Sequence, residues 1–284
     1  MEPAVEIRNL VKEFRPAGRK EPLRAVDDVS LSIGAGEVYG LIGPNGSGKS
    51  TTMKALLGLV QPDSGSCRIF GNDSLQVDSR QQVGFLPENP YFYKHLSGAE
   101  TLRFYGKLCG LRGAALEGRV KELLELVDLS EAGNRRLGGY SKGMLQRIGL
   151  AQALVQEPRL VILDEPTAGV DPIGSRQIRD LIFDLKKRGI TVFLCSHLLE
   201  QVQEVCDRVG IIHRGRMVKE GPLDELLAVG DQTEIILRGA SPELLEKIRA
   251  LVSSDSGAEL LRAGRPRTTL ERLFLQETAD RRKP

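Results

Sequence analysis

Apolar side chains recur at every second position at the start of the chain. This pattern over residues 5–14 and 29–33 predicts two half-buried β-strands, and the proline, glycine and charges of residues 15–24 predict a surface loop between them. A short apolar run over residues 38–42 ends in a glycine-rich loop, and residues 49–57 have the composition of a helix. The chain is therefore predicted to begin with β-structure and to continue as strand, glycine loop and helix.

The middle of the chain changes from strand patterns to helical patterns. Residues 97–100 have the sequence of a capping box, apolar residues follow at helical spacing, and residues 116–129 form a second amphipathic stretch. Residues 88–157 are therefore predicted to be a helical insertion between two strand-bearing parts.

After this insertion, strand and helix patterns alternate, which is typical of a mainly parallel sheet with helices on its faces. The predicted strands are residues 160–163, 191–194, 209–212 and 217–219, and the predicted helices are residues 175–188 and 198–205. The pattern weakens beyond residue 221, where we predict a small accessory segment. Its predicted elements are helices over residues 223–228, 242–252 and 270–277 and a strand over residues 234–237.

Composition excludes several classes of protein. The chain has 284 residues, 40% of them apolar and 27% charged, so a wholly disordered chain is excluded. Its 40 basic and 38 acidic side chains leave a net charge of +2, without the basic excess of a dedicated DNA-binding domain, and no nucleic-acid partner is expected. Apolar runs such as residues 160–163 are too short for a membrane helix or a secretory signal, so we expect a soluble, cytoplasmic protein. Four widely spaced cysteines are expected to fill the interior as small apolar side chains: Cys67, Cys109, Cys195 and Cys206.

The glycine-rich loop carries the first candidate chemistry. Residues 43–50 match the phosphate-binding pattern G-x-x-x-x-G-K-[ST], in which backbone N–H groups curl around phosphate oxygens at a helix N-terminus. Lys49 is predicted to reach the β- and γ-phosphates of a nucleotide, and the Ser50 hydroxyl to bind Mg²⁺. The predicted nucleotide-binding residues of this loop are Gly43, Pro44, Asn45, Gly46, Ser47, Gly48, Lys49, Ser50 and Thr51.

Two adjacent carboxylates end a hydrophobic strand. Asp164 and Glu165 follow residues 160–163, at the position where open α/β sheets place their ligands. Asp164 is predicted to hold Mg²⁺, and Glu165 to orient and deprotonate an attacking water. The alternative is a charged loop end without chemistry.

A third motif, together with the two above, resembles the motifs of a known protein family. Ser141 stands 23 residues before Asp164, in the segment Tyr140-Ser141-Lys142-Gly143-Met144, and the chain resembles the nucleotide-binding subunit of an ABC transporter over about residues 5–221. This resemblance implies an α/β fold, a P-loop NTPase cassette with a mainly parallel core sheet, an N-terminal antiparallel β part, a helical insertion and a small C-terminal α+β extension. The predicted domains are the cassette, residues 1–220, and the accessory segment, residues 221–284. Within the cassette, the core is residues 1–87 and 158–220, and the helical subdomain is residues 88–157.

The resemblance also implies how ATP is bound. Two cassettes meet head to tail, so that each ATP lies between the phosphate loop of one and the signature motif of the other, where Ser141 and Gly143 contact it. Ser141 is also a good N-cap for the helix that follows, which is its alternative role. Asp171 resembles a residue of the family's D-loop, and its alternative role is to form a turn before Pro172.

Three further residues are assigned through the resemblance. His197 resembles the family's switch histidine, which contacts the γ-phosphate, and the alternative is a structural histidine. Phe14 resembles the aromatic residue that stacks on adenine, and the alternative is a core aromatic. Glu88 stands where most members carry glutamine, and it retains an oxygen for Mg²⁺ or water while adding a charge. The predicted catalytic residues are therefore Lys49, Glu88, Glu165 and His197, and the predicted metal ligands are Ser50, Glu88 and Asp164.

Two further clusters suggest contacts with other molecules. Tyr91, Phe92 and Tyr93 follow Glu88, and we predict that they dock a helix of a membrane partner; the alternative is that they pack the helical insertion. A terminal basic cluster predicts at most peripheral contact with lipid: Arg281, Arg282 and Lys283.

The signature segment also indicates a subgroup. Tyr140 and Lys142 replace the usual leucine and glycine, as in the ATPases of bacterial ABC-2-type exporters. This resemblance implies an ATPase, with ATP and Mg²⁺ as cofactors, that dimerises with itself or with a paired cassette. It would power export by a separate integral membrane permease from the inner face of the cell membrane. Two alternatives are a soluble ABC ATPase that acts on nucleic acid or ribosomes, and a low-turnover regulatory dimer.

Overall fold

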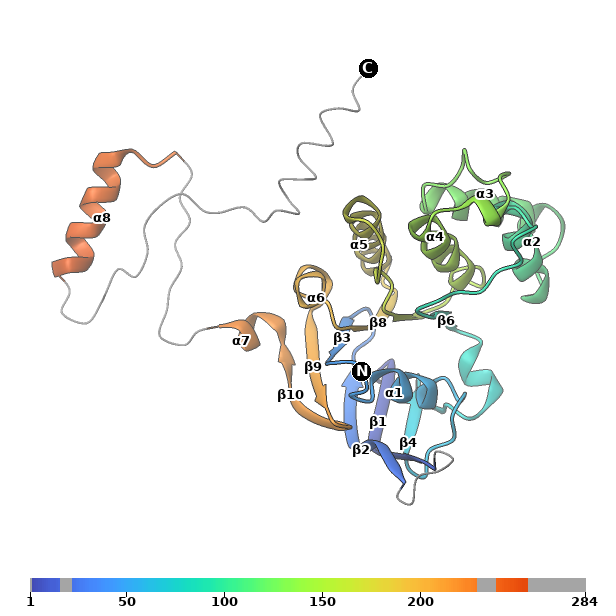
Figure 1. The fold of residues 1–284 in the computed structure, drawn as a ribbon, viewed down its shortest axis with the longest axis horizontal. Coiled ribbons are helices and arrows are strands. Elements are labelled where there is room, and N and C mark those ends of the chain that lie inside the picture. The colour runs from blue at the N-terminus through green and yellow to red at the C-terminus, as the bar shows by residue number, and fades with distance from the viewer. Residues whose placement is uncertain (1, 16–21, 229–238, 255–284) are drawn as a thin grey trace. The chain divides into compact units, whose positions relative to one another are not determined.

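The structure, a computed structural model, describes residues 2–15, 22–228 and 239–254. The chain divides into two compact units, residues 1–226 and residues 227–284. The first unit holds two sheets and most of the helices (Figure 1).

The larger sheet is mainly parallel, as predicted. Its six strands lie in the order β10-β9-β3-β8-β7-β6, and only β10 runs antiparallel to its neighbour. Strands β7 and β8 are buried on both faces, which explains why they are continuous apolar runs in the sequence. The strands are β3 (Val38–Ile42), β6 (Val83–Leu86), β7 (Leu160–Asp164), β8 (Thr191–Ser196), β9 (Arg208–His213) and β10 (Arg216–Pro222).

The smaller sheet is antiparallel and contains the N-terminal strands, which confirms the predicted antiparallel part. Its order is β2-β1-β4-β5. Strand β2 begins inside the segment predicted to be a loop, because Leu23 and Arg24 pair with Phe14 and Glu13 of β1. The strands are β1 (Val5–Phe14), β2 (Leu23–Ile33), β4 (Ser64–Ile69) and β5 (Asn72–Asp73).

Alternate residues of the parallel strands face two hydrophobic cores. Leu160 and Ile162 pack with α1 (Lys49–Leu56) and the antiparallel sheet. Val161 and Leu163 pack in the other core, together with residues of α4 (Lys142–Ala153), α5 (Pro172–Lys187), α6 (Leu199–Val205) and other helices. The two-residue period of the strands therefore places the sheet between two apolar layers.

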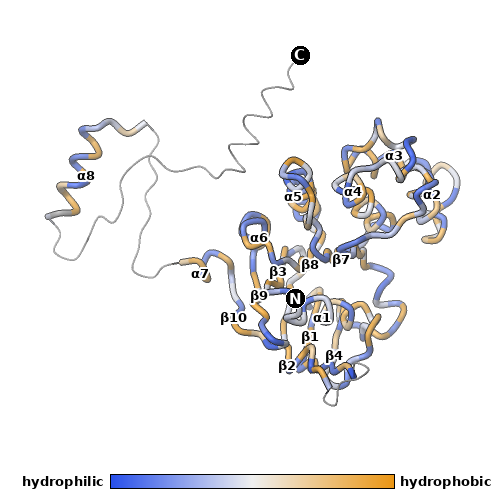
Figure 2. Tube along the Cα trace, viewed as in Figure 1, coloured by the Kyte–Doolittle hydropathy of each residue, from blue (hydrophilic) through white to orange (hydrophobic). Residues whose placement is uncertain are grey.

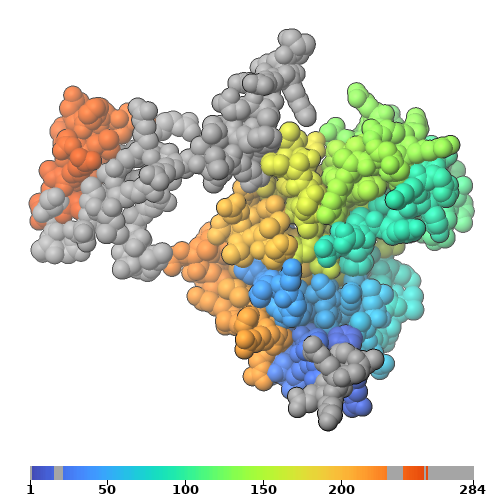
Figure 3. Space-filling view, in the orientation of Figure 1, coloured from blue at the N-terminus to red at the C-terminus, as the bar shows by residue number. Residues whose placement is uncertain are grey.

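The helical insertion forms the teal and green lobe in Figure 3. Helix α2 (Gly98–Leu108) begins at the predicted capping box, in which the Glu100 N–H donates to Ser97 Oγ at 3.2 Å and the Ser97 N–H donates to Glu100 Oε2 at 2.8 Å. The two bonds satisfy donors that the first helical turn leaves free. Helix α3 (Gly113–Leu126) follows. One short 3₁₀ turn, Val77–Arg80, precedes β6, and another, Leu137–Gly139, lies between α3 and α4.

Two further local predictions were wrong. Helix α5 begins at Pro172 rather than at residue 175, because Asp171 caps it and proline suits the first helical position. Cys109 is exposed, because it lies at the surface end of α2, whereas Cys67, Cys195 and Cys206 are buried as predicted.

The C-terminal part begins inside the first unit. Helix α7 (Leu223–Leu227) contributes the buried Leu223 to the core. The domain boundary at residue 220 stays a prediction. In the second unit, α8 (Pro242–Ser254) alternates apolar and polar residues along its length (Figure 2). No described helix is long and apolar enough to cross a membrane. The predicted strand over residues 234–237, the predicted helix over residues 270–277 and the basic cluster at residues 281–283 lie outside the described residues.

Candidate functional site

The parallel sheet brings the predicted catalytic segments to one edge. Gly43 follows β3, Glu165 follows β7 and His197 follows β8, and β8 lies between β3 and β7 in the sheet. Because parallel strands all end at the same edge, three segments that are far apart in the sequence meet there.

The glycine loop has no room for side chains at two of its positions. The φ angle of Gly48 is +111°, and a Cβ at this residue would lie 2.6 Å from the Ala25 carbonyl oxygen. A Cβ at Gly43 would lie 2.2 Å from the Ile212 carbonyl oxygen. Gly48 is also the N-cap of α1 and has no side chain to cap it, so the first N–H groups of the helix can serve an anion.

One buried hydroxyl of the loop also fits a phosphate ligand. The Ser47 side-chain oxygen is buried and has no hydrogen-bond partner in the described part of the chain. Buried hydroxyls are nearly always paired, so this group fits a ligand oxygen at the loop. Pro44, Asn45 and Gly46 are exposed at the surface of the same loop.

Lys49 is buried beside the loop. Its Nζ atom donates to the Gly43 carbonyl at 2.6 Å and to the Pro44 carbonyl at 3.3 Å, and it lies 3.8 Å from Glu165 Oε1. The structure therefore brings the predicted phosphate-binding cation and the predicted base together.

The Glu165 carboxylate is held at both oxygens. Oε1 lies 2.9 Å from His197 Nδ1, and Oε2 accepts from the Ser196 hydroxyl at 3.2 Å and from the His197 backbone N–H at 3.3 Å. The backbone of Glu165 is in the left-handed region, with φ of 49°, and its N–H donates to the Cys195 carbonyl at 2.9 Å. Ser196 was missed by sequence reasoning, although a hydroxyl just before a histidine at a strand end was the available signal.

Asp164 and Ser50 supply two oxygens that fit Mg²⁺. The Ser50 hydroxyl donates to Asp164 Oδ1 at 3.4 Å. Burial raises the pKa of Asp164, and the charges of Glu165 and Glu88 raise it further. A hard dication with few protein ligands suits this pair, since Mg²⁺ usually keeps waters and binds substrate phosphates. The described residues contain no group of three or more His, Cys, Asp or Glu that could hold a metal ion.

The backbone and the side chain of Glu88 differ in their contacts. Its side chain is exposed, and no hydrogen bond or ion pair joins it to Ser50 or Asp164 in the described residues. Its carbonyl oxygen accepts from Gln146 Nε2 at 2.8 Å. A metal or catalytic role for Glu88 stays a prediction.

The signature residues gather at a second place. Ser141 caps α4 and its hydroxyl accepts from the Met144 N–H at 3.2 Å, while Asp171 caps α5 and accepts from the Gly174 N–H at 2.8 Å. A Cβ at Gly143 would lie 3.1 Å from Val170, so the two helix starts are in close contact. In the described residues, no hydrogen bond or ion pair joins this place to Lys49, Asp164 or Glu165.

The predicted aromatic contacts lie apart from these two places. Phe14 ends β1 with its ring partly exposed, and Lys12 Nζ lies 5.6 Å from the ring centroid, so Phe14 is not a core residue. Phe92 is buried against α4, which means that it packs the helical insertion and is not available for docking. Tyr91 and Tyr93 are exposed, and the Tyr93 ring contacts Phe104 with centroids 6.1 Å apart.

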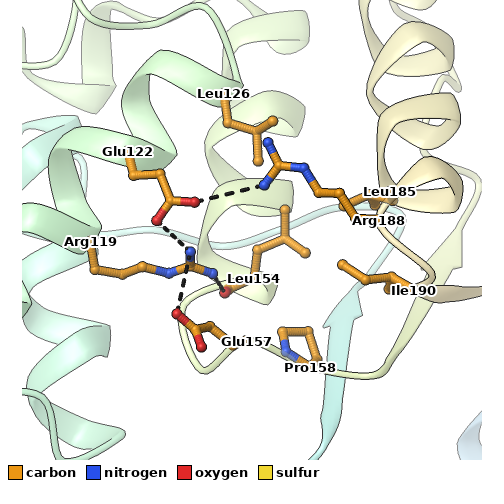
Figure 4. A pocket seen from close by; sticks show the side chains of 9 residues that line it. All are labelled: Arg119, Glu122, Leu126, Leu154, Glu157, Pro158, Leu185, Arg188 and Ile190. Carbon is orange, nitrogen blue, oxygen red and sulfur yellow. Dashed lines mark hydrogen bonds and ion pairs between the residues drawn. The ribbon is translucent and has the colours of Figure 1, made fainter.

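A cavity of about 320 Å³ lies elsewhere, at the edge where β7 and β8 begin (Figure 4). Arg119 lies 2.7 Å from Glu122 there, and Arg188 lies 3.7 Å from the same carboxylate. The remaining lining residues are Leu126, Leu154, Glu157, Pro158, Leu185 and Ile190. This cavity contains none of the predicted site residues.

The chain is similar in sequence to known proteins. Residues 26–168 match the ABC transporter family. The chain is 39% identical over 237 residues to an uncharacterised ABC transporter ATP-binding protein of Synechocystis, which covers 83% of this chain and 67% of that protein. It is 40% identical over 206 residues to the bacitracin transport ATP-binding protein BcrA of Bacillus licheniformis, which covers 72% of this chain and 66% of that protein. The chain thus spans about two thirds of the length of these relatives.

A solved structure extends the comparison to the fold. A dimeric ATP-binding cassette bound to ADP and Pi is 25% identical to this chain and superimposes with a TM-score of 0.70, over 77% of this chain and 98% of that chain. The family match, the sequence relatives and the fold therefore agree. The resemblance seen in the sequence is confirmed, and the chain belongs to the ABC transporter family as an ATP-binding cassette.

Proposed function

We propose that this chain hydrolyses ATP between two cassettes and thereby powers export by a separate membrane permease. The observation that carries the proposal is the buried Glu165 carboxylate, which His197 and Ser196 hold 3.8 Å from the Lys49 ammonium. A fixed carboxylate beside a phosphate-binding loop is suited to take a proton from water. The transport names of the relatives support export over action on nucleic acid or ribosomes.

The chemistry follows from the positions of these side chains. Water attacks the γ-phosphorus in line, Glu165 accepts the proton of that water, and the bond to the bridging oxygen of ADP breaks. Lys49, which now donates to two loop carbonyls, would donate to phosphate oxygens instead. Ser50 and Asp164 would hold Mg²⁺, which offsets the charge of the phosphate oxygens.

The separation of the two places within one chain supports a dimer. Ser141 and Gly143 lie at the start of α4, away from the phosphate loop at the start of α1. A nucleotide on the phosphate loop would then meet the signature residues of a second cassette, either a copy of this chain or a paired cassette. The likeness to a dimeric cassette favours this arrangement.

The dimer can be tested with a variant that binds ATP but does not hydrolyse it. Glu165→Gln should form dimers with ATP, measured by size exclusion with light scattering, and should remain monomeric without ATP. Adding Lys49→Ala to this variant should abolish the dimer, because the nucleotide is then poorly bound. Monomers under both conditions, with a wild-type rate per molecule that does not depend on concentration, would contradict the proposal.

The permease would dock on an exposed aromatic patch, Tyr91, Tyr93 and Phe104. Tyr91 is 85% exposed, and such rings are favoured anchors at interfaces. A Tyr91→Ser/Tyr93→Ser double variant should keep its basal ATPase rate and lose co-purification with the permease. The control is Val218→Ser, an exposed apolar site on β10. Retained co-purification of the double variant would place the contact elsewhere.

A further inference from the structure

Two glutamines donate the same kind of hydrogen bond near the two ends of one strand. Gln156 Nε2 donates to the carbonyl of Val83, the first residue of β6, at 2.8 Å. Gln146 Nε2 donates at 2.8 Å to the carbonyl of Glu88, two residues beyond the end of β6. The bonds are chemically alike, but only the second one reaches a predicted site residue.

The burial of the Gln146 side chain carries a cost in free energy that its packing does not explain. The residue is 1% exposed, and its Oε1 atom is buried without a hydrogen-bond partner among the described residues. Burying an unpaired polar oxygen is unfavourable, and an apolar side chain of similar shape would avoid it. The hydrogen bond that Nε2 donates to the Glu88 carbonyl is therefore the reason for a glutamine at this position.

The loop that contains Glu88 is seated on the signature helix. A Cβ at Gly149 of α4 would lie 2.6 Å from Leu86, 3.5 Å from Pro90 and 3.6 Å from Phe92. This close approach fixes the distance between the loop and α4. The Gln146 hydrogen bond fixes the position of the Glu88 carbonyl. Strand β6, which leads into this loop, pairs with β7, and Leu86 lies opposite Leu163, the residue before Asp164.

We infer that Gln146 is a positioning residue that ties the Glu88 loop to the signature helix. Ser141 caps the same helix five residues earlier. The groups around Asp164, which face the nucleotide of this chain, and Ser141, which faces the nucleotide of the other cassette, would then move together. This inference rests on the proposed ATPase dimer.

Matched substitutions test the role of the bond. Gln146→Met keeps the shape, removes the donor and also removes the unpaired oxygen, so thermal unfolding should stay near that of the wild type. Its kcat for ATP hydrolysis should fall about 10-fold while KM for ATP stays within about 3-fold, as expected when an interaction matters mainly in the transition state. The control, Gln156→Met, removes the matching bond at Val83 and should keep kcat within about 2-fold. If Gln146→Met does not fold, Gln146→Leu is the second variant that lacks the donor.

A double-mutant cycle separates positioning from packing. In a Glu88→Ala background the bond to the backbone carbonyl remains but the Glu88 carboxylate that it positions is absent, so Gln146→Met should change kcat by less than about 2-fold. A full 10-fold loss in that background, or an equal loss for Gln156→Met, would overturn the inference. If the wild type hydrolyses ATP and Glu165→Gln dimerises while Gln146→Met behaves like the wild type, only this inference fails. A wild type without ATPase activity would instead overturn the proposed function.

Discussion

Two charged clusters lie at opposite edges of the parallel sheet and differ in their contact with water. At the edge where β3 and β7 end, the side chains of Lys49 and Glu165 are 6% and 8% exposed. At the edge where β7 and β8 begin, Glu122 and Arg188 border the cavity and are each 49% exposed (Figure 4). The same types of residue are therefore buried at one edge and solvated at the other.

The two clusters differ in the hydrogen-bond partners that their charged groups have in place of water. The Lys49 ammonium donates to two loop carbonyls, and the Glu165 carboxylate accepts from a backbone N–H and a hydroxyl. At the other edge, Glu122 and Arg188 are half exposed, so water can solvate both charges, and exposed ion pairs contribute little to stability. Buried, hydrogen-bonded charges interact strongly and are fixed in position, as phosphate chemistry requires. The exposed ion pairs can be substituted with little effect on function. The comparison predicts large functional effects at the first edge and small ones at the second.

The largest effect is expected for Glu165→Gln. The amide keeps the shape of the side chain but cannot accept the proton of water, so ATP turnover should fall by about 10²-fold or more. A phosphate-release assay measures the turnover, and an ATP titration should show retained binding. The matched control at the opposite edge, Glu122→Gln, should stay within about 2-fold of the wild type. Near-normal hydrolysis by Glu165→Gln would remove Glu165 from its assigned role.

Lys49→Ala should act on binding. Removing a charged donor to phosphate costs about 1.5–3 kcal/mol, which corresponds to roughly 10- to 100-fold in ATP affinity. Fluorescence titration with an ATP analogue measures this loss, and Arg188→Ala serves as the control cation. Unchanged affinity of the Lys49 variant would contradict the assignment of the phosphate loop.

Asp164→Asn should stabilise the fold, with a defined pH dependence. The pKa of Asp164 is raised above its ordinary value of 3.8, mainly by burial, so the folded state binds the proton more tightly than the unfolded state does. Ionisation therefore costs stability, and this cost is absent below about pH 3.8 and grows as the pH rises through the raised pKa. At neutral pH the variant should gain about 2–4 °C in Tm, the shift that corresponds to roughly 1 kcal/mol in a domain of this size. Thermal melts across the pH range would refute this if the gain were largest in acid.

The smallest effect is expected for Arg188→Gln at the cavity. Its ion pair with Glu122 is long, at 3.7 Å, and half-exposed. The free energy of unfolding should change by less than about 1 kcal/mol, and high salt should reduce even that difference. Urea denaturation measures it, and a larger loss would mean that this edge is as tightly organised as the catalytic one.

The sequence by itself determined the features that depend on neighbouring residues. The glycine loop, the capping box at Ser97, the cap at Ser141 and the apolar strand before Asp164 are set by local spacing and by bonds that span three residues. These signals were sufficient to predict the mainly parallel sheet, the helical insertion and the segments that carry the phosphate loop and the two carboxylates. Local hydrogen bonding and side-chain periodicity are properties of the chain itself.

Only the tertiary structure decided which side chains are buried and which groups meet across the sheet. Phe92 is buried and Tyr91 exposed, although they are adjacent aromatics, because α4 covers one of them. The bonds from Ser196 to Glu165 and from Gln146 to Glu88 join segments that are 31 and 58 residues apart. Such contacts depend on the order of strands and on helix packing, and no local pattern encodes the distance between two segments that the fold brings together.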